Sequence, residues 1–142
     1  MAEVSRAFSE VSPRRGLIIG VIPATVEPLE SLERRQTSDI AYLLPPGYPN
    51  EWVEIAVYTH LDATGSDGTL SSSRNHITVL SADAVVALPG QEGTWSEMWL
   101  AIQYGVPIIA YGDHGPVTPH GIERAGTLDQ VRVFLERFRA RR

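Results

Sequence analysis

Three features in the middle of the sequence could act together on a phosphorylated ligand. They are Arg74, the turn Pro89-Gly90-Gln91-Glu92-Gly93-Thr94, and Glu97. The glycines Gly90 and Gly93 allow backbone amides to approach a ligand closely, and the planar guanidinium of an arginine matches the geometry of phosphate oxygens. Glu97 lies one turn into the helix that is predicted to follow the turn. We therefore expect a phosphate-type anion to bind at this turn.

Two strand–loop–helix units are predicted to position these residues. The apolar run 83–88 is typical of a strand covered on both faces, and the helical pattern of 94–104 ends at Gly105, a common residue after helices. The other unit pairs a strand at 52–58 with a helix at 74–82. Because loops that follow parallel strands open at one edge of a sheet, both helix N-termini are expected to offer free amides to one crevice.

The rest of the chain continues the alternation of strands and helices. Strands are expected at 17–22 and 106–111, helices at 2–10 and 128–139, a short apolar segment at 42–44, a loop with a short helix at 24–38, and loops at 59–69 and 112–126. This order predicts an α/β fold, a Rossmann-like parallel sheet flanked by helices, in a single domain of residues 1–142. Within the helix at 74–82, Ile77 and Leu80 are expected to face inward.

The site residues also have ordinary structural interpretations. Thr94 and Glu97 have the spacing of a capping box, in which the glutamate folds back on the first amide of a helix. Arg74 could be a surface ion-pair residue. The spacing alone leaves these alternatives open, because a single Gly-x-x-Gly turn is a weak signal.

Composition excludes several classes of function. The chain has 142 residues, a net charge of -5, no cysteine and, among its twelve cationic side chains, no lysine. A pyridoxal phosphate Schiff base and the P-loop both need a lysine, and thiolate catalysis needs a cysteine. The four histidines fit no standard ligand spacing, so no metal is expected. The charge disfavours nucleic acid, and no apolar run spans a membrane or forms a leader, so a cytoplasmic protein is expected.

The segment Pro89-Gly90-Gln91-Glu92-Gly93-Thr94-Trp95-Ser96-Glu97 resembles the PGGxGTxxE signature of the LOG (LONELY GUY) phosphoribohydrolases. Their relatives are often labelled lysine decarboxylase-like and include molybdenum cofactor carrier proteins. The stretch from Arg74 to Ala110 looks like this family nearly throughout, and Gly16 to Pro23 resembles its third strand. Relative to that family, the chain is expected to lack the first two strands.

The resemblance implies roles for individual residues. Arg74 and Glu97 fall on the catalytic pair of LOG enzymes, which cleave the N-glycosidic bond of nucleoside 5′-monophosphates to a base and ribose 5-phosphate. Ligand-binding residues would be Asn75 and five residues of the turn, namely Gly90, Gln91, Glu92, Gly93 and Thr94.

Two differences from the LOG signature favour a carrier-like binding protein. Gln91 replaces the second glycine, and Asn75 follows Arg74 where LOG enzymes usually have lysine. The resemblance therefore implies binding of a nucleotide monophosphate or a molybdopterin-type ligand, with phosphoribohydrolase activity as the alternative and an inactive dimerising module as a third. No cofactor is expected to be required. A homodimer or higher homo-oligomer is the expected assembly.

Overall fold

The computed structural model describes residues 2–26, 42–114 and 118–139. The chain folds as two compact units, Met1–Asp62 and Ala63–Arg142, which are described separately below. The predicted short helix within 24–38 falls largely outside the described residues. No helix in the described ranges is long and apolar enough to cross a membrane.

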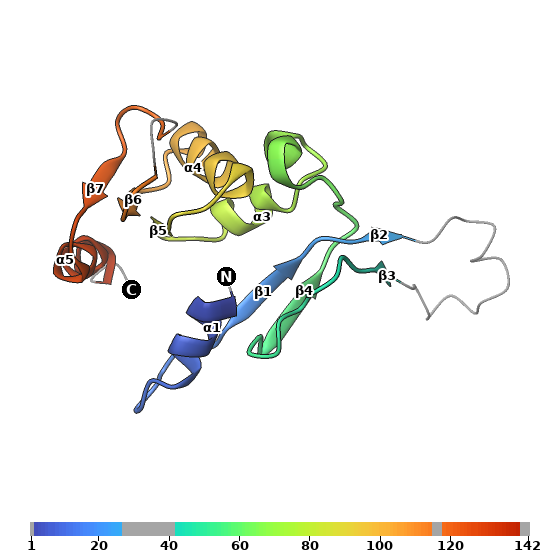
Figure 1. Ribbon diagram of the computed structural model, residues 1–142, viewed down its shortest axis with the longest axis horizontal. Helices are drawn as coiled ribbons and strands as arrows, with labels where there is room; N and C mark the ends of the chain where they lie inside the picture. The colour runs from blue at the N-terminus through green and yellow to red at the C-terminus, as the bar shows by residue number, and fades with distance from the viewer. Residues whose placement is uncertain (1, 27–41, 115–117, 140–142) are drawn as a thin grey trace, which may run out of the picture. The chain divides into compact units, whose positions relative to one another are not determined.

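The described residues of the first unit form one helix and two small sheets (Figure 1). Strand β1 (Ile19–Ile22) pairs in parallel with β4 (Ile55–Tyr58), and β2 (Thr25–Val26) pairs antiparallel with β3 (Tyr42–Leu43). The predicted strands at 17–22 and 52–58 are thus present but shorter. Strands β1 and β4 are parallel, as their continuous apolar runs predicted.

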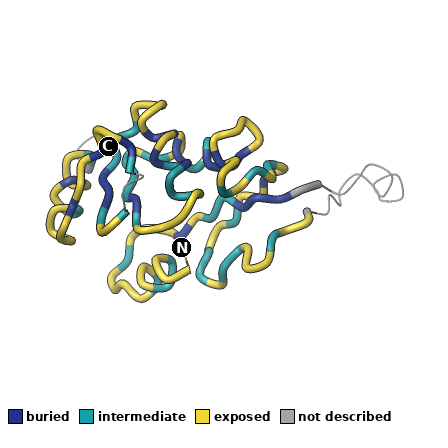
Figure 2. The backbone as a smooth tube through the Cα atoms, turned by 45° about the horizontal axis from the view of Figure 1, so that its top comes forward, coloured by how far each residue is buried: buried dark blue, intermediate teal, exposed yellow. Residues whose placement is uncertain are grey.

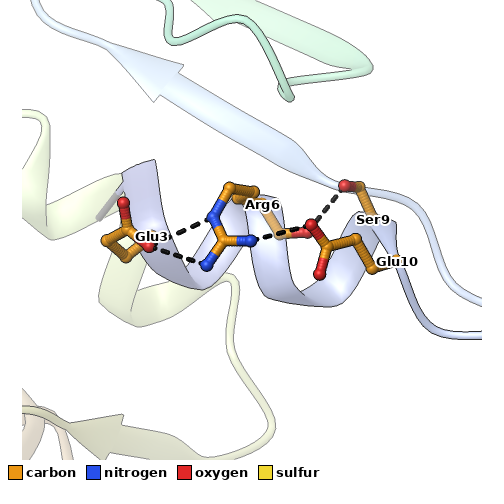
Figure 3. A network of polar contacts seen from close by, with 4 residues as sticks. All are labelled: Glu3, Arg6, Ser9 and Glu10. Carbon is orange, nitrogen blue, oxygen red and sulfur yellow. Dashed lines mark hydrogen bonds and ion pairs between the residues drawn. The ribbon is translucent and has the colours of Figure 1, made fainter.

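Helix α1 (Ala2–Ser9) is supported by ion pairs along its own surface. Figure 3 shows Arg6 between two carboxylates, with Nη2 3.0 Å from Oε2 of Glu3 and Nη1 2.8 Å from Oε1 of Glu10. These are the spacings at which helical side chains meet. None of the helix residues is buried, and Figure 2 shows this segment as exposed and intermediate.

An ion pair joins the segment after α1 to the start of β4. Nη2 of Arg14 lies 2.8 Å from Oε1 of Glu54, and the backbone amide of Ile18 donates to Oε2 of Glu54 at 2.8 Å. These two donors lower the pKa of Glu54 to about 2. The guanidinium also lies over the ring of Phe8, 5.4 Å from its centroid. Glu54, immediately before β4, therefore links the start of β4 to the segment that precedes β1.

The second unit has a three-stranded parallel sheet in the order β5 (Val85–Ala87), β6 (Ile108–Tyr111) and β7 (Glu123–Ala125). Alternate residues of these strands face opposite sides. Ala87 and Ala110 pack with Met98 of helix α4 (Glu92–Tyr104). Ile109 packs on the other face with Phe134 of helix α5 (Leu128–Arg139). The sheet is therefore covered by helices on both faces, as Figure 1 shows.

Helix α3 (Asn75–Leu80) and the 3-10 helix η1 (Gly65–Thr69) pack against α4. The core here is made by Val79, Leu100 and Ala101, all at most 1% exposed. On the other side of the sheet, the carboxylate of Glu123 in β7 pairs with Arg137 of α5 at 2.8 Å. Both helical layers are therefore tied to the sheet by apolar packing, and α5 by an ion pair as well.

The predicted fold class is confirmed, since parallel strands alternate with flanking helices. Several details were wrong. Ile77 and Leu80 do not face inward but are 38% and 58% exposed, because Val79 and the polar Asn75 occupy the buried side of α3. The predicted loops at 59–69 and 112–126 contain η1 and β7. Gly105 ends α4 as predicted, in the left-handed conformation with φ 65°.

Truncation of two leucines tests the assignment of the core. Leu100 is 0% exposed and Leu80 is 58% exposed. Leu100→Ala is expected to lower the free energy of unfolding by about 2–5 kcal/mol, because it leaves a cavity. Leu80→Ala removes the same atoms from the surface and should cost less than about 0.5 kcal/mol. Urea denaturation measures both, and similar losses in the two variants would contradict the packing described here.

The Arg14–Glu54 pair predicts a contribution to stability at low pH. The pKa of Glu54 is about 2 in the folded chain and 4.5 as the ordinary value, so its contribution is complete above pH 4.5 and is lost as the pH falls towards 2. Glu54→Gln should therefore reduce the decline in melting temperature between these two pH values. The exposed Glu51 gives the matched control. Glu51→Gln should show the same decline in melting temperature at low pH as the unmodified protein.

Candidate ligand-binding cavity

The glycine turn leads directly into α4. The helix begins at Glu92, two residues earlier than predicted, and Gln91 is its N-cap residue with no side-chain capping hydrogen bond. Its first intrahelical bond runs from the amide of Trp95 to the carbonyl of Gln91, at 3.2 Å. The capping-box alternative for Thr94 and Glu97 is therefore wrong, since both lie inside the helix. The amides of the first turn are those that a helix leaves for other acceptors.

Close packing fixes the shape of this turn. A Cβ on Gly90 would overlap Oγ1 of Thr94 and lie 2.9 Å from the threonine Cβ, so a larger residue there would displace Thr94, which folds back over the turn. The loop after β6 packs against Pro89 at the start of this turn. Gly112 has φ +89°, and a Cβ there would lie 2.9 Å from Cγ of Pro89. The segments that follow the two parallel strands β5 and β6 are thus packed against each other.

A cavity of about 700 Å³ opens at this point, entirely within the second unit. It is lined by residues from η1, from the turn and first half of α4, and from the segment between β6 and β7: Ser66, Gly90, Gln91, Glu92, Thr94, Trp95, Met98, His114 and Thr118. Its volume is in the range of small-molecule sites, and it combines aromatic and apolar surface with a few polar groups. These are the properties of a ligand pocket.

Four of the predicted ligand residues line this cavity, namely Gly90, Gln91, Glu92 and Thr94. Gly93 does not line it, although a Cβ at that position would meet open space. Asn75 is only 4% exposed, and its amide Nδ2 lies against Gly68. The predicted catalytic residues, Arg74 and Glu97, are not among the lining residues either. The structure therefore places four residues of the turn in the wall of the cavity and leaves the other four predicted residues outside it.

Arg74 and Glu97 influence each other electrostatically. Burial raises the pKa of the half-buried Glu97, and the positive charge of Arg74 acts in the opposite direction. Arg74 is itself half-buried and immediately precedes α3, which packs on α4. The two predicted catalytic groups are therefore close enough to interact, and the raised pKa favours a protonated carboxyl relative to an exposed glutamate.

Five of the lining residues were not among the predicted site residues: Ser66, Trp95, Met98, His114 and Thr118. His114 could have been found, because it follows β6 and ligands of parallel sheets gather beyond the carboxyl ends of strands. Its Nε2 lies 3.1 Å from the carbonyl oxygen of Tyr111, which assigns the ring proton to that nitrogen in the neutral form. Ser66 gave no signal, since it comes from a segment that was expected to be an irregular loop.

Comparison with known proteins agrees with this architecture. Parallel strands between helices, with a cavity beyond the strand ends, define a Rossmann-like α/β protein. The chain belongs to the SLOG cluster4 family, whose model matches residues 1–133. SLOG proteins include LOG-like proteins, and the family indicates a nucleotide-related ligand or glycosidase-like chemistry. No curated protein and no solved structure matches the chain.

Two glycine substitutions test the geometry of the turn. Gly90→Ala should displace Thr94 and lower the melting temperature, because its Cβ would overlap the threonine side chain. Gly93→Ala meets nothing within 4 Å and lies in the first turn of α4, where alanine favours the helix by up to about 1 kcal/mol. Differential scanning calorimetry should therefore show opposite effects. A stable Gly90→Ala variant would contradict the described packing.

Proposed function

We propose that this protein binds a phosphorylated, nucleotide-like ligand in the cavity formed by the Gly90–Thr94 turn and α4. The observation that carries the proposal is the position of the turn in the wall of a cavity large enough for such a ligand. A phosphate would take hydrogen bonds from the amides at the start of α4 and would be favoured by the positive end of its dipole. A nucleoside 5′-monophosphate or a molybdopterin-type compound has this chemistry.

The remaining lining residues suit a planar ring attached to the phosphate. Trp95 and Met98 supply apolar surface on one side of α4, and Trp95 is further held by an edge contact with Trp99 at a centroid distance of 5.9 Å. Aromatic side chains bind purines and pterins by stacking. His114 and Thr118 add hydrogen-bonding groups from the segment between β6 and β7. The cavity therefore offers both an apolar surface and polar groups to one ligand.

Binding without turnover is supported better than glycosidic cleavage. Hydrolysis by the LOG mechanism would need Arg74 and Glu97 at the ligand, and neither lines the cavity. The raised pKa of Glu97 favours the second candidate, a phosphoribohydrolase, because a protonated carboxyl can donate a proton to a leaving base. Carrier-like binding is therefore the proposed function, and hydrolysis of the bound nucleotide is the alternative that the experiment below distinguishes from it.

Isothermal titration calorimetry with AMP tests the proposal. The unmodified protein should bind AMP saturably and should release no adenine on prolonged incubation. Gln91→Glu should weaken binding by about tenfold, since it adds negative charge beside the phosphate. The same substitution should not lower the melting temperature, because a carboxylate suits the N-terminus of a helix.

Gln103→Glu is the matched control, since Gln103 is exposed near the other end of α4. It adds the same charge away from the cavity and should leave the affinity for AMP unchanged. Absence of AMP binding to the unmodified protein, or equal weakening by both variants, would refute the proposed site. Release of adenine that is abolished by Glu97→Ala would establish the hydrolase instead.

A further inference from the structure

A carboxylate in the wall of the cavity needs a partner other than phosphate. Glu92 lines the cavity, and its negative charge would repel the phosphate of the proposed ligand. Oε2 of Glu92 lies over η1, 3.3 Å from the position that a Cβ on Gly65 would take. The next residue of η1, Ser66, lines the same cavity. A carboxylate and a hydroxyl thus lie on adjoining segments of one wall.

This wall is held in place by buried hydrogen bonds. Ser96 of α4 is 0% exposed, and its Oγ lies 3.0 Å from the carbonyl oxygen of Gly65 and 2.9 Å from that of Glu92. The single hydroxyl therefore links η1 to the first turn of α4. Gly68 is buried against the same serine, since a Cβ there would lie 2.6 Å from Oγ of Ser96.

The other end of η1 is fixed by a histidine. Nε2 of His76 lies 2.9 Å from the carbonyl oxygen of Leu70, and its Nδ1 lies 2.6 Å from the hydroxyl of Tyr104 in the last turn of α4. One end of η1 is thus bound to Ser96 of α4, and the other end to His76 of α3, which packs on α4. Ser66 and Glu92 consequently keep a defined position relative to each other, as a specific binding site requires.

We propose that Glu92 and Ser66 form a hydroxyl-binding subsite that recognises the sugar of the ligand. A carboxylate accepts hydrogen bonds at both oxygens and donates none, which matches a pair of neighbouring hydroxyl groups. A serine hydroxyl can donate to or accept from the same sugar. The inference rests on the proposed function and narrows it: the ligand carries a sugar diol as well as a phosphate. A ribonucleotide fits this description, and a dideoxynucleotide does not.

The discriminating measurement is the ratio of the dissociation constants of 2′,3′-dideoxy-AMP and AMP. The unmodified protein should give a ratio of about 10 or more, because a hydrogen bond to a charged acceptor contributes substantially to binding. Glu92→Gln should reduce the ratio towards about 1, and Ser66→Ala should reduce it in part. A general loss of protein stability would weaken the binding of both nucleotides equally and would leave the ratio of their dissociation constants unchanged.

Glu136→Gln and Ser71→Ala are the matched controls, since both residues are exposed and neither lines the cavity. Both should keep the ratio of the unmodified protein. A ratio near 1 in the unmodified protein, or a ratio that Glu92→Gln leaves unchanged, overturns the subsite while the binding of AMP still supports the proposed function. Failure of the unmodified protein to bind AMP overturns both inferences.

Discussion

The close approach of two loops beyond the ends of β5 and β6 is the constraint on which the site depends. Gly90 leaves room for the side chain of Thr94, and Gly112 leaves room for the ring of Pro89. These contacts set where α4 begins, and the start of α4 in turn sets the wall of the cavity. Glycine at both positions is therefore explained by packing within the protein, before any ligand is considered.

Charge is distributed unevenly around this site. Glu92 is exposed at the cavity, whereas Glu97, one and a half turns further along α4, is half-buried and has a raised pKa. The positive charge of Arg74 acts on the half-buried Glu97 and lowers its pKa, against the effect of burial. Two carboxylates on one helix thus have different environments, and the exposed one is better suited to accept hydrogen bonds from neutral donors of a ligand.

Sequence patterns predicted the fold better than the site. Apolar runs located β1, β5 and β6 because buried parallel strands are continuously apolar. The polar strand β7 was missed, since Glu123–Ala125 becomes a strand through pairing with β6. The signature located the turn, but Ser66 and His114 reach the cavity only through tertiary packing. Local periodicity also misplaced Ile77 and Leu80, because a six-residue helix gives too few positions to define its buried side.

The buried side of α3 explains why periodicity failed there. Asn75 in α3, Ser73 just before α3 and Ser96 in the neighbouring α4 are at most 4% exposed, so polar groups are buried where α3 meets α4. Oγ of Ser73 accepts a hydrogen bond from the amide of Asn75 at 3.2 Å, and Ser96 binds the carbonyl of Gly65. Buried polar groups require such partners, so they fix one arrangement of η1, α3 and α4 where apolar contacts would allow several. These buried polar residues make the buried side of α3 hard to recognise in the sequence, and their hydrogen bonds also fix the wall of the cavity.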